Sequence, residues 1–266
     1  MNKFKTERYH LKVASFNANG IRARMPVILK WLEKESPDIL CIQETKVQDR
    51  DFPCTPFEET GYCCSFKGQK SYNGVAILSQ TAPENVETGF NDGDEKEKPR
   101  LIRAAINGIE IVNTYVPQGR EPDSEMFRYK IDWFDRLRHY FENSFNPEAP
   151  VIWAGDFNVA PRPIDVYDPK ALLGSIGYHP KEHRALSQVM EWGFVDLYRL
   201  HKPEEKAFTF WDYRIPNAVK RGLGWRIDHI CATRCLAKKS KTAWIDAEPR
   251  RMQKPSDHTF IVAEFY

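Results

Sequence analysis

Two stretches with a common ending decide the fold: Leu11-Lys-Val-Ala-Ser-Phe-Asn17 and Val151-Ile-Trp-Ala-Gly-Asp-Phe-Asn158. Each contains a short apolar run of the kind that forms a strand, and each closes with Phe-Asn. The repeated ending indicates two similar sheets that meet, with polar side chains at the end of one strand in each.

Further apolar runs predict more strands of these sheets. Together with 11–16 and 151–154, the predicted strands are 39–42, 75–78, 109–116, 226–232 and 260–265. Patterns typical of helices lie between some of them, at 25–34, 124–141 and 181–192. The last helix has Pro180 at its first position and Gly193 as a stop. Strands that alternate with helices predict an α/β fold.

Composition limits the alternatives. The chain has 266 residues, of which 41% are hydrophobic and 13% aromatic, so it can bury a substantial core and is not disordered. Its net charge is only +2, so any affinity for phosphate must come from local arrangement. The most polar stretch, 91–99, is short and predicts a surface loop, and we expect residues 1–266 to form a single domain.

The cysteines and the N-terminus bear on location. The six cysteines form no Cys-x-x-Cys pair, and we expect them to be reduced and mostly buried. Residues 1–10 are polar and charged, and no apolar run approaches the length of a membrane span. These features predict a soluble, cytoplasmic protein without membrane contact.

Acidic and amide side chains follow several predicted strands. They are Asn17, Asn19, Glu44, Asp156 and Asn158. The ends of strands in α/β folds are where sites are assembled. Because a lone Asp or Asn at such a position is about as often a turn residue, the conjunction of several carries the argument for a site.

A second group of polar residues comes late in the chain. Asp228 is flanked by Ile227 and Ile230, and an unpaired carboxylate there would carry a large desolvation cost. A histidine is the natural partner, since the carboxylate would orient the ring and raise its pKa. We expect His258 to be that partner, because side-chain alternation places His229 on the face opposite Asp228.

The oxygen-rich set favours Mg²⁺ or Mn²⁺ over zinc. The segment His179-Pro-Lys-Glu-His183 lacks the residue order of a zinc-binding helix, and Pro180 marks it as a helix start. A hard divalent ion beside Asp, Asn and a supported His is suited to phosphoryl transfer.

A series of motifs, taken in order, resembles the exonuclease III branch of the endonuclease/exonuclease/phosphatase superfamily. The motifs are Ser15-Phe-Asn-Ala-Asn-Gly-Ile-Arg22, Ile42-Gln-Glu-Thr-Lys46, Tyr72-Asn-Gly-Val-Ala76, Asn113-Thr-Tyr-Val-Pro-Gln-Gly119, Gly155-Asp-Phe-Asn158, Trp225-Arg-Ile-Asp228 and Pro255-Ser-Asp-His258. The resemblance runs from about residue 11 to the C-terminus. It implies a four-layer α/β sandwich, in which two mixed β-sheets pack face to face with flanking helices.

The resemblance also implies roles for individual residues. Glu44 would bind the metal, assisted by Asn17 and Asp257, while Asp156 and Asn158 would form a second metal site. The implied catalytic set is Tyr115, Asp156, Asn158, Asp228 and His258, none of which is missing. Asp156 would activate or position the attacking water and Asn158 would hold it. The metal, with His258 and Tyr115, would stabilise the phosphate oxygens and the leaving group.

The expected substrate class depends on two segments of the chain, residues 207–214 and 224–228. In the family, aromatic residues of these segments line a pocket for a flipped-out abasic sugar, and here they would be Phe210, Trp225 and Ile227. A small apolar pocket accepts a deoxyribose without a base and excludes an intact nucleotide. Trp211 is expected in the core instead.

The remaining DNA contacts expected are polar residues near the motifs. They are Asn19, Arg22, Lys46, Asn73, Gln118 and Arg120. A basic rim of this kind would bind phosphates despite the near-neutral net charge, because counterion release depends on local contacts.

The resemblance therefore implies a monomer that cuts double-stranded DNA 5′ to abasic sites, leaving a 3′-hydroxyl. Mg²⁺ would be the cofactor, with Mn²⁺ also supporting activity, and 3′–5′ exonuclease and 3′-end-cleaning activity would be weaker. Two alternatives stay open. One is a phosphodiesterase of the same fold acting on inositol phosphates, lipid phosphates or RNA, and the other is a non-catalytic nucleic-acid-binding homologue.

Overall fold

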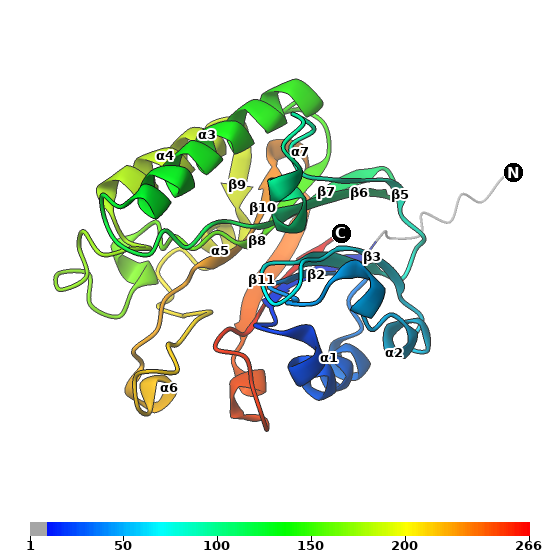
Figure 1. Cartoon of the computed structure of the whole chain (residues 1–266), viewed down its shortest axis with the longest axis horizontal. Coiled ribbons are helices and arrows are strands. Elements are labelled where there is room, and N and C mark those ends of the chain that lie inside the picture. Colours follow the sequence, from blue (N-terminus) through cyan, green and yellow to red (C-terminus); the bar gives the residue numbers. More distant parts are fainter. Residues whose placement is uncertain (1–9) are drawn as a thin grey trace, which may run out of the picture.

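The computed structural model describes residues 10–266 and contains two six-stranded sheets packed face to face (Figure 1). Sheet A has the order β11 (Ser240–Asp246), β12 (Phe260–Phe265), β1 (Leu11–Asn17), β2 (Ile39–Gln43), β4 (Val75–Ser79) and β3 (Cys63–Lys67). Sheet B has the order β5 (Glu84–Thr88), β6 (Leu101–Ile106), β7 (Ile109–Tyr115), β8 (Val151–Asp156), β10 (Asp228–Thr233) and β9 (Phe194–Asp196). The polar segment 1–9, which bears on the expectation about location, lies outside the described residues.

The two stretches that share a Phe-Asn ending contain β1 and β8. Strand β1 pairs in parallel with β2 and antiparallel with β12, while β8 pairs in parallel with β7 and antiparallel with β10. The two strands therefore hold equivalent positions in the two sheets. Their ends meet, since Asn17 Nδ2 donates a 2.9 Å hydrogen bond to Asp156 Oδ2. The expectation of two similar sheets is confirmed.

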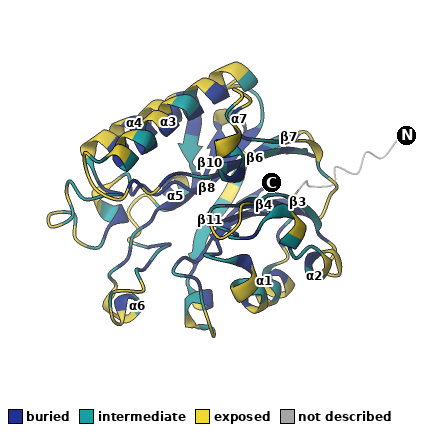
Figure 2. Cartoon of the chain, in the orientation of Figure 1, coloured by how far each residue is buried: buried dark blue, intermediate teal, exposed yellow. Residues whose placement is uncertain are grey.

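Helices cover the outer faces of both sheets (Figures 1 and 2). Helices α1 (Ile21–Glu35) and α2 (Thr55–Glu58) pack on sheet A, and α3 (Glu125–Ser144) and α4 (Pro180–Met190) lie side by side on sheet B. One apolar cluster fills the space between the sheets and two others lie beneath the helices. Because the central strands are covered on both faces, they are apolar along nearly their whole length. The predicted four-layer α/β sandwich is confirmed.

Local signals account for most helix boundaries. Ser124 caps α3 by accepting a hydrogen bond from Phe127 N, and His179 caps α4 directly before Pro180. Helix α4 ends at Met190, three residues before the predicted stop at Gly193, and α1 starts four residues earlier than predicted.

Several elements were not predicted. They are strands β3, β5, β6, β9 and β11 and the short helices α2, α5 (Leu197–His201), α6 (Ala218–Arg221) and α7 (Arg234–Ala237). The expected surface loop at 91–99 is wrong in part, since Glu95–Arg100 forms a 3-10 helix in which Glu97 is 3% exposed. Glu97 is buried because it accepts hydrogen bonds from Tyr129 Oη and Trp133 Nε1 of α3.

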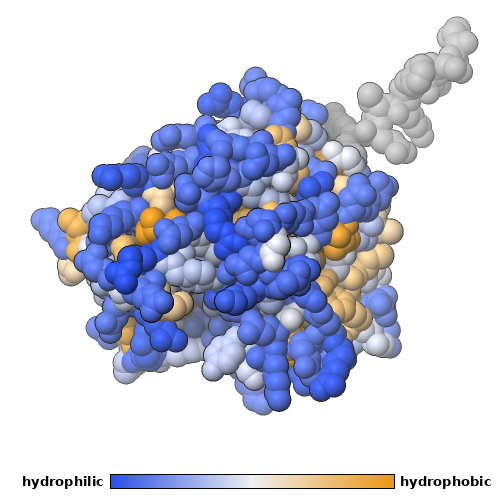
Figure 3. Space-filling view, turned by 45° about the horizontal axis from the view of Figure 1, so that its top comes forward, coloured by the Kyte–Doolittle hydropathy of each residue, from blue (hydrophilic) through white to orange (hydrophobic). Residues whose placement is uncertain are grey.

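Two other expectations are tested by the described residues. All six cysteines are free, but only Cys41 and Cys231 are buried, so the expectation that most are buried is wrong. The other four lie near sheet edges and short helices, where they are half-covered. No helix within residues 10–266 combines the length and the apolar content that a membrane crossing requires. The face in Figure 3 is mainly hydrophilic, with small separate hydrophobic areas.

Candidate active site

A cleft of about 480 Å³ lies at the edge of the sandwich where β1, β2 and β8 end and where β10 and β12 begin. Parallel neighbours bring the polar residues after β1 and β2 to the same edge, and the antiparallel partners bring the starts of β10 and β12 there. The predicted site residues that line it are Asn19, Glu44, Lys46, Tyr115, Gln118, Asp156, Asn158, Phe210, Trp225, Ile227, Asp257 and His258.

The other predicted site residues do not line the cleft. Asn17 and Asp228 are fully buried behind it. Arg22 lies exposed on α1, where its Nη2 is 3.5 Å from Asp51 Oδ1. Asn73 and Arg120 lie on separate loops outside the cleft wall.

Many of these residues adopt an unusual backbone conformation. Asn19, Glu44, Lys46, Asn73, Arg120 and Asn158 all have φ between 45° and 58°. This left-handed region is uncommon for residues with a Cβ, and such strain gathers at functional sites. Hydrogen bonds between loops hold the conformation: Gly20 N donates to Glu44 O, and Lys46 N donates to Asn73 O.

Asp156 lies at the centre of the site and is 1% exposed. Its Oδ2 accepts hydrogen bonds from Asn17 Nδ2 at 2.9 Å and Asn158 Nδ2 at 3.3 Å, and its Oδ1 accepts one from Asn158 N. Burial, and then the nearby Asp228 carboxylate, raise the pKa of Asp156 to about 7. A carboxylate with such a pKa is suited to exchange a proton near neutral pH.

His258 lies between two carboxylates. Its Nδ1 is 2.8 Å from Asp228 Oδ2, as expected, and its Nε2 is 3.8 Å from Asp156 Oδ2. Burial alone would lower the pKa of His258, but the Asp228 and Asp156 carboxylates outweigh it and raise that pKa to about 10. The imidazole is therefore held as a cation inside the site. His229 instead bonds Arg226 and the carbonyl oxygen of Val159, as its position on the opposite face requires.

Glu44 and Tyr115 also line the cleft. Burial, followed by the charges of Glu44 and Asp156, raises the pKa of the Tyr115 phenol well above its usual range, so the hydroxyl stays protonated as a hydrogen-bond donor. Lys46 Nζ lies 3.0 Å from Glu44 Oε1 and donates to Asn19 Oδ1. Asn19 Nδ2 in turn donates to Asp257 Oδ1 at 2.9 Å, which links the two acids.

The oxygen donors of the cleft fit a hard divalent cation. Glu44 and Asp257 line the cleft, and Glu44 pairs with the half-exposed Lys46. Carboxylates and amides are the ligands that Mg²⁺ or Mn²⁺ prefer. Asp156, Asp228 and His258 also bring potential ligand atoms within 4.8 Å of one another. In that group the His258 imidazole already pairs with both carboxylates, so the three residues are better suited to pair charges with one another than to bind a metal.

An apolar pocket adjoins these charges. Phe210 and Trp225 are bridge partners, and Phe210 also packs on His258 with ring centroids 4.9 Å apart. Ile227 lies beside them, while Trp211 is 6% exposed in a separate apolar cluster, as expected. The sequence analysis missed the other residues that line this cleft, which are Tyr167, Leu172, Ile176, Gly177, Asp212, Arg214 and Ile215.

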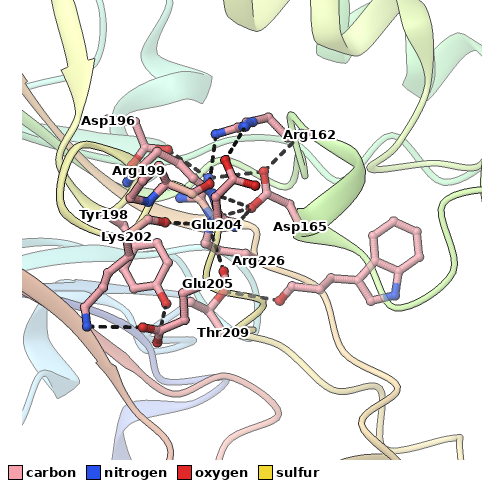
Figure 4. Close-up of polar contacts among 12 residues, drawn as sticks. Arg162, Asp165, Asp196, Tyr198, Arg199, Lys202, Glu204, Glu205, Thr209 and Arg226 are labelled. Carbon is pink, nitrogen blue, oxygen red and sulfur yellow. Dashed lines mark hydrogen bonds and ion pairs between the residues drawn. The ribbon is translucent and has the colours of Figure 1, made fainter.

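A buried ion network fixes the segment that carries Trp225, Ile227 and Asp228 (Figure 4). Arg226 is 0% exposed, and its Nε lies 2.6 Å from Asp165 Oδ1 while its Nη2 lies 2.8 Å from Asp196 Oδ2. The network also explains why β10 begins at Asp228 and not at the predicted Arg226, because Arg226 N donates to Asp165 O outside the sheet. An arginine inside an apolar run was the available signal for such a network.

Comparison with known proteins identifies the family to which this fold and cleft belong. Residues 14–258 match the Endonuclease/Exonuclease/phosphatase family. The exodeoxyribonuclease III of Haemophilus influenzae is 33% identical over 96% of this chain and 100% of its own. The structure of an AP endonuclease from Archaeoglobus fulgidus superposes with a TM-score of 0.93 at 47% identity, covering 96% of this chain and 99% of that one.

A further solved structure carries nucleic acid. It is a 3′ phosphatase from Neisseria bound to a product DNA hairpin, with a TM-score of 0.92 and 33% identity over 96% of this chain and 99% of that one. Family match and relatives agree over nearly the full length. The chain therefore belongs to the endonuclease/exonuclease/phosphatase family and is a metal-dependent hydrolase of its exonuclease III branch of DNA repair nucleases.

Proposed function

We propose that the protein hydrolyses the phosphodiester bond 5′ to abasic sites in double-stranded DNA and leaves a 3′-hydroxyl. The observation that carries the proposal is one cleft in which an apolar pocket of Phe210, Trp225 and Ile227 adjoins the charged group of Asp156 and His258. A pocket of this kind accepts a sugar that has lost its base. Relatives named as an exodeoxyribonuclease III, an AP endonuclease and a 3′ phosphatase support the same substrate class.

Each residue of the site has a separate role in the proposed reaction. The Asp156 carboxylate takes a proton from the attacking water, which Asn158 helps to hold, because a carboxylate with a pKa near 7 can act as the base at neutral pH. The His258 cation, oriented by Asp228, and the Tyr115 hydroxyl stabilise negative charge on the phosphate oxygens and on the leaving 3′ oxygen. As the bond between phosphorus and this oxygen breaks, the oxygen takes up a proton from solvent and becomes the 3′-hydroxyl. A divalent ion, which we propose to be Mg²⁺ with Mn²⁺ as a substitute, would be held by Glu44 and Asp257 and would add Lewis-acid stabilisation.

Other site residues have supporting roles. Asn17 already bonds Asp156 and Asn19, so only the second lone pair of its Oδ1 is available to a metal. Asp156 and Asn158 would hold a second divalent ion only as an alternative to their role with the attacking water. Phosphate contacts come from Lys46, Gln118 and Asn19 in the cleft and from Arg22, Asn73 and Arg120 outside it.

We further infer a cytoplasmic monomer with weaker 3′–5′ exonuclease and 3′-end-cleaning activity. The free cysteines agree with a reducing compartment. Sedimentation of the purified protein, alone and with duplex, tests the oligomeric state.

The activity is tested with labelled duplex that carries a single tetrahydrofuran site. We expect incision 5′ to the site with Mg²⁺ and none with EDTA, and no incision by Asp156→Asn, which should still bind the duplex because the basic residues remain. Cleavage by Asp156→Asn at the wild-type rate would contradict the role given to Asp156. An inositol polyphosphate, a lipid phosphate and a single-stranded RNA serve as competing substrates, and preferred turnover of any of them would overturn the assignment.

A further inference from the structure

A buried ion pair lies directly behind the cleft and has no part in the mechanism above. Lys130 of α3 and Glu182 of α4 are both 0% exposed, and Lys130 Nζ donates to Glu182 Oε1. Figure 1 shows the two helices side by side on sheet B. Taking two charges out of water is costly, and a buried pair is often no more stabilising than apolar residues of similar size. Its presence therefore calls for a reason other than stability.

The lysine ties two loops of the cleft together. Besides Glu182, its Nζ donates to the carbonyl oxygen of Asn158 at 2.8 Å and to that of Gln118 at 3.3 Å. Among the described residues no other donor bonds either carbonyl. Asn158 follows β8 and Gln118 follows β7, and both side chains face the cleft. One ammonium group thus fixes the two backbones from behind.

The glutamate holds a third loop. Its Oε2 accepts hydrogen bonds from Gly177 N at 2.8 Å and His179 N at 3.1 Å. Gly177 lines the pocket next to Trp225 at φ 83°, and a Cβ there would lie 3.4 Å from both the Trp225 ring and Asn158 O. The position of this loop therefore sets the wall of the pocket beside Trp225.

We propose that Lys130 and Glu182 are positioning residues, which set the relative placement of Asn158, Gln118 and the pocket wall at Gly177 for phosphodiester hydrolysis. This inference rests on the proposed function for its substrate. Loss of the ammonium would leave the buried carbonyl of Asn158 and the partly buried carbonyl of Gln118 without a donor, and the loops would shift to find other partners. Small displacements of groups that hold a reacting water have large effects on rate.

The test separates position from stability. The double variant Lys130→Met/Glu182→Met removes both charges together, so no buried charge is left unpaired. Because backbone groups that bonded the pair lose their partners, we expect a lower melting temperature but a folded protein at the assay temperature. We expect its kcat on the tetrahydrofuran duplex to fall by about a hundredfold, while Kd for the uncleaved duplex in EDTA stays near the wild-type value. Glu182→Gln keeps one oxygen as the acceptor for Gly177 N and His179 N, but its amide NH2 would face the Lys130 ammonium. We therefore expect a smaller loss of kcat than in the double variant, together with a lower melting temperature.

Glu97→Gln is the matched control, since Glu97 is also a buried acid that bonds α3 but it holds no loop of the cleft. Wild-type kcat in a stably folded double variant would overturn the inference, as would an equal loss of kcat in the control. Lys130→Met/Glu182→Gln replaces the double variant if the latter does not fold, with the same expected loss of kcat. Should the wild type fail to cut the abasic duplex, the proposed function is wrong, and the same comparison is then made on nucleotide release from 3′ ends.

Discussion

At the scale of single residues, the site keeps opposite charges close together and away from water. His258 touches both Asp228 and Asp156, and Asp156 also accepts three hydrogen bonds from amides. Each group changes the pKa of its neighbours, so a substitution at one position also shifts the pKa values at the others. Glu44 also lines the cleft but makes no hydrogen bond or ion pair with these three residues, and its proposed role as a metal ligand is tested separately.

Glu44→Ala is expected to weaken metal binding and to reduce incision sharply at low Mg²⁺, with partial recovery at high Mg²⁺, because a ligand carboxylate is lost. The measurement is the rate of incision as a function of Mg²⁺ concentration. Glu95→Ala, at an exposed acid of the 3-10 helix, is the control. A Glu44→Ala protein with the wild-type metal dependence would show that Glu44 is not a ligand.

The pairing of His258 predicts how activity depends on pH. Its pKa is raised from 6.5 to about 10, so the cation and its stabilising contribution are fully present below pH 6.5 and are lost as the pH rises toward 10. Asp228→Asn removes the largest of the three charges that raise this pKa, those of Asp228, Asp156 and Asp257, so the decline of kcat at alkaline pH should begin at a lower pH than in the wild type. Rate profiles from pH 6 to 10 measure this decline, and identical profiles for the two proteins would refute the proposed role of Asp228.

At the scale of elements, the segment before β10 carries residues of the proposed sugar pocket and leads directly into Asp228, which bonds His258. Phe157 N donates to Ile227 O, and both Ile227 N and Asp228 N donate to Thr209 Oγ1. The pocket residues and the acid that orients His258 are therefore held by one short piece of backbone. The ion network around Arg226 holds this segment as well, since Arg226 pairs with Asp165 and Asp196 just before β10 begins.

Replacement of both Phe210 and Trp225 by Ala should reduce incision at tetrahydrofuran sites more than hydrolysis at 3′ ends, where less sugar recognition is needed. Loss of one to a few kcal/mol, about the scale of a buried aromatic contact, would change the ratio of the two kcat/KM values roughly tenfold or more. Trp211→Phe, in the neighbouring cluster, is the control for packing. Equal losses on both substrates, with unchanged melting, would mean that these aromatic residues serve general DNA binding.

At the scale of the whole molecule, a net charge of +2 must coexist with binding to a polyanion. The solution we propose is local, with Arg22, Lys46 and Arg120 around the cleft. Of these three residues, Lys46 alone lines the cleft, and its side chain is 35% exposed. Each lysine or arginine that meets a phosphate releases counterions, and its contribution depends on salt.

Arg120→Ala should weaken binding to undamaged and abasic duplex alike, and should reduce the slope of log K against log salt concentration by about one. Lys241→Ala, on the edge strand β11 of sheet A, should leave the slope unchanged. Titrations by fluorescence anisotropy between low and moderate salt give both slopes. A selective loss on abasic duplex would point to damage recognition by Arg120 and not to a backbone contact.

Much of this architecture can be predicted from the chain itself. The central strands are apolar along their length because both faces are covered, and the Phe-Asn endings of 11–17 and 151–158 mark equivalent strands of the two sheets. Edge strands were not predicted, because side chains of an edge strand that face solvent need not be apolar. Strand β5, for example, has the sequence Glu-Asn-Val-Glu-Thr, which is polar and shows no apolar alternation. The single domain over residues 1–266 stays a prediction, supported by the apolar cluster shared between the sheets.

The sequence by itself also determined which chemical groups the site would contain, since Glu44, Asp156, Asp228 and His258 stand at strand ends in a recognisable order. Only the tertiary structure decided what surrounds them. Lys130 and Glu182 look like solvated charges on their helices, and Leu172 and Ile176 look like ordinary loop residues, yet they lie behind and beside the cleft. The reason is physical: strand ends are set by local apolar runs, whereas contacts between distant helices and loops depend on how the layers pack.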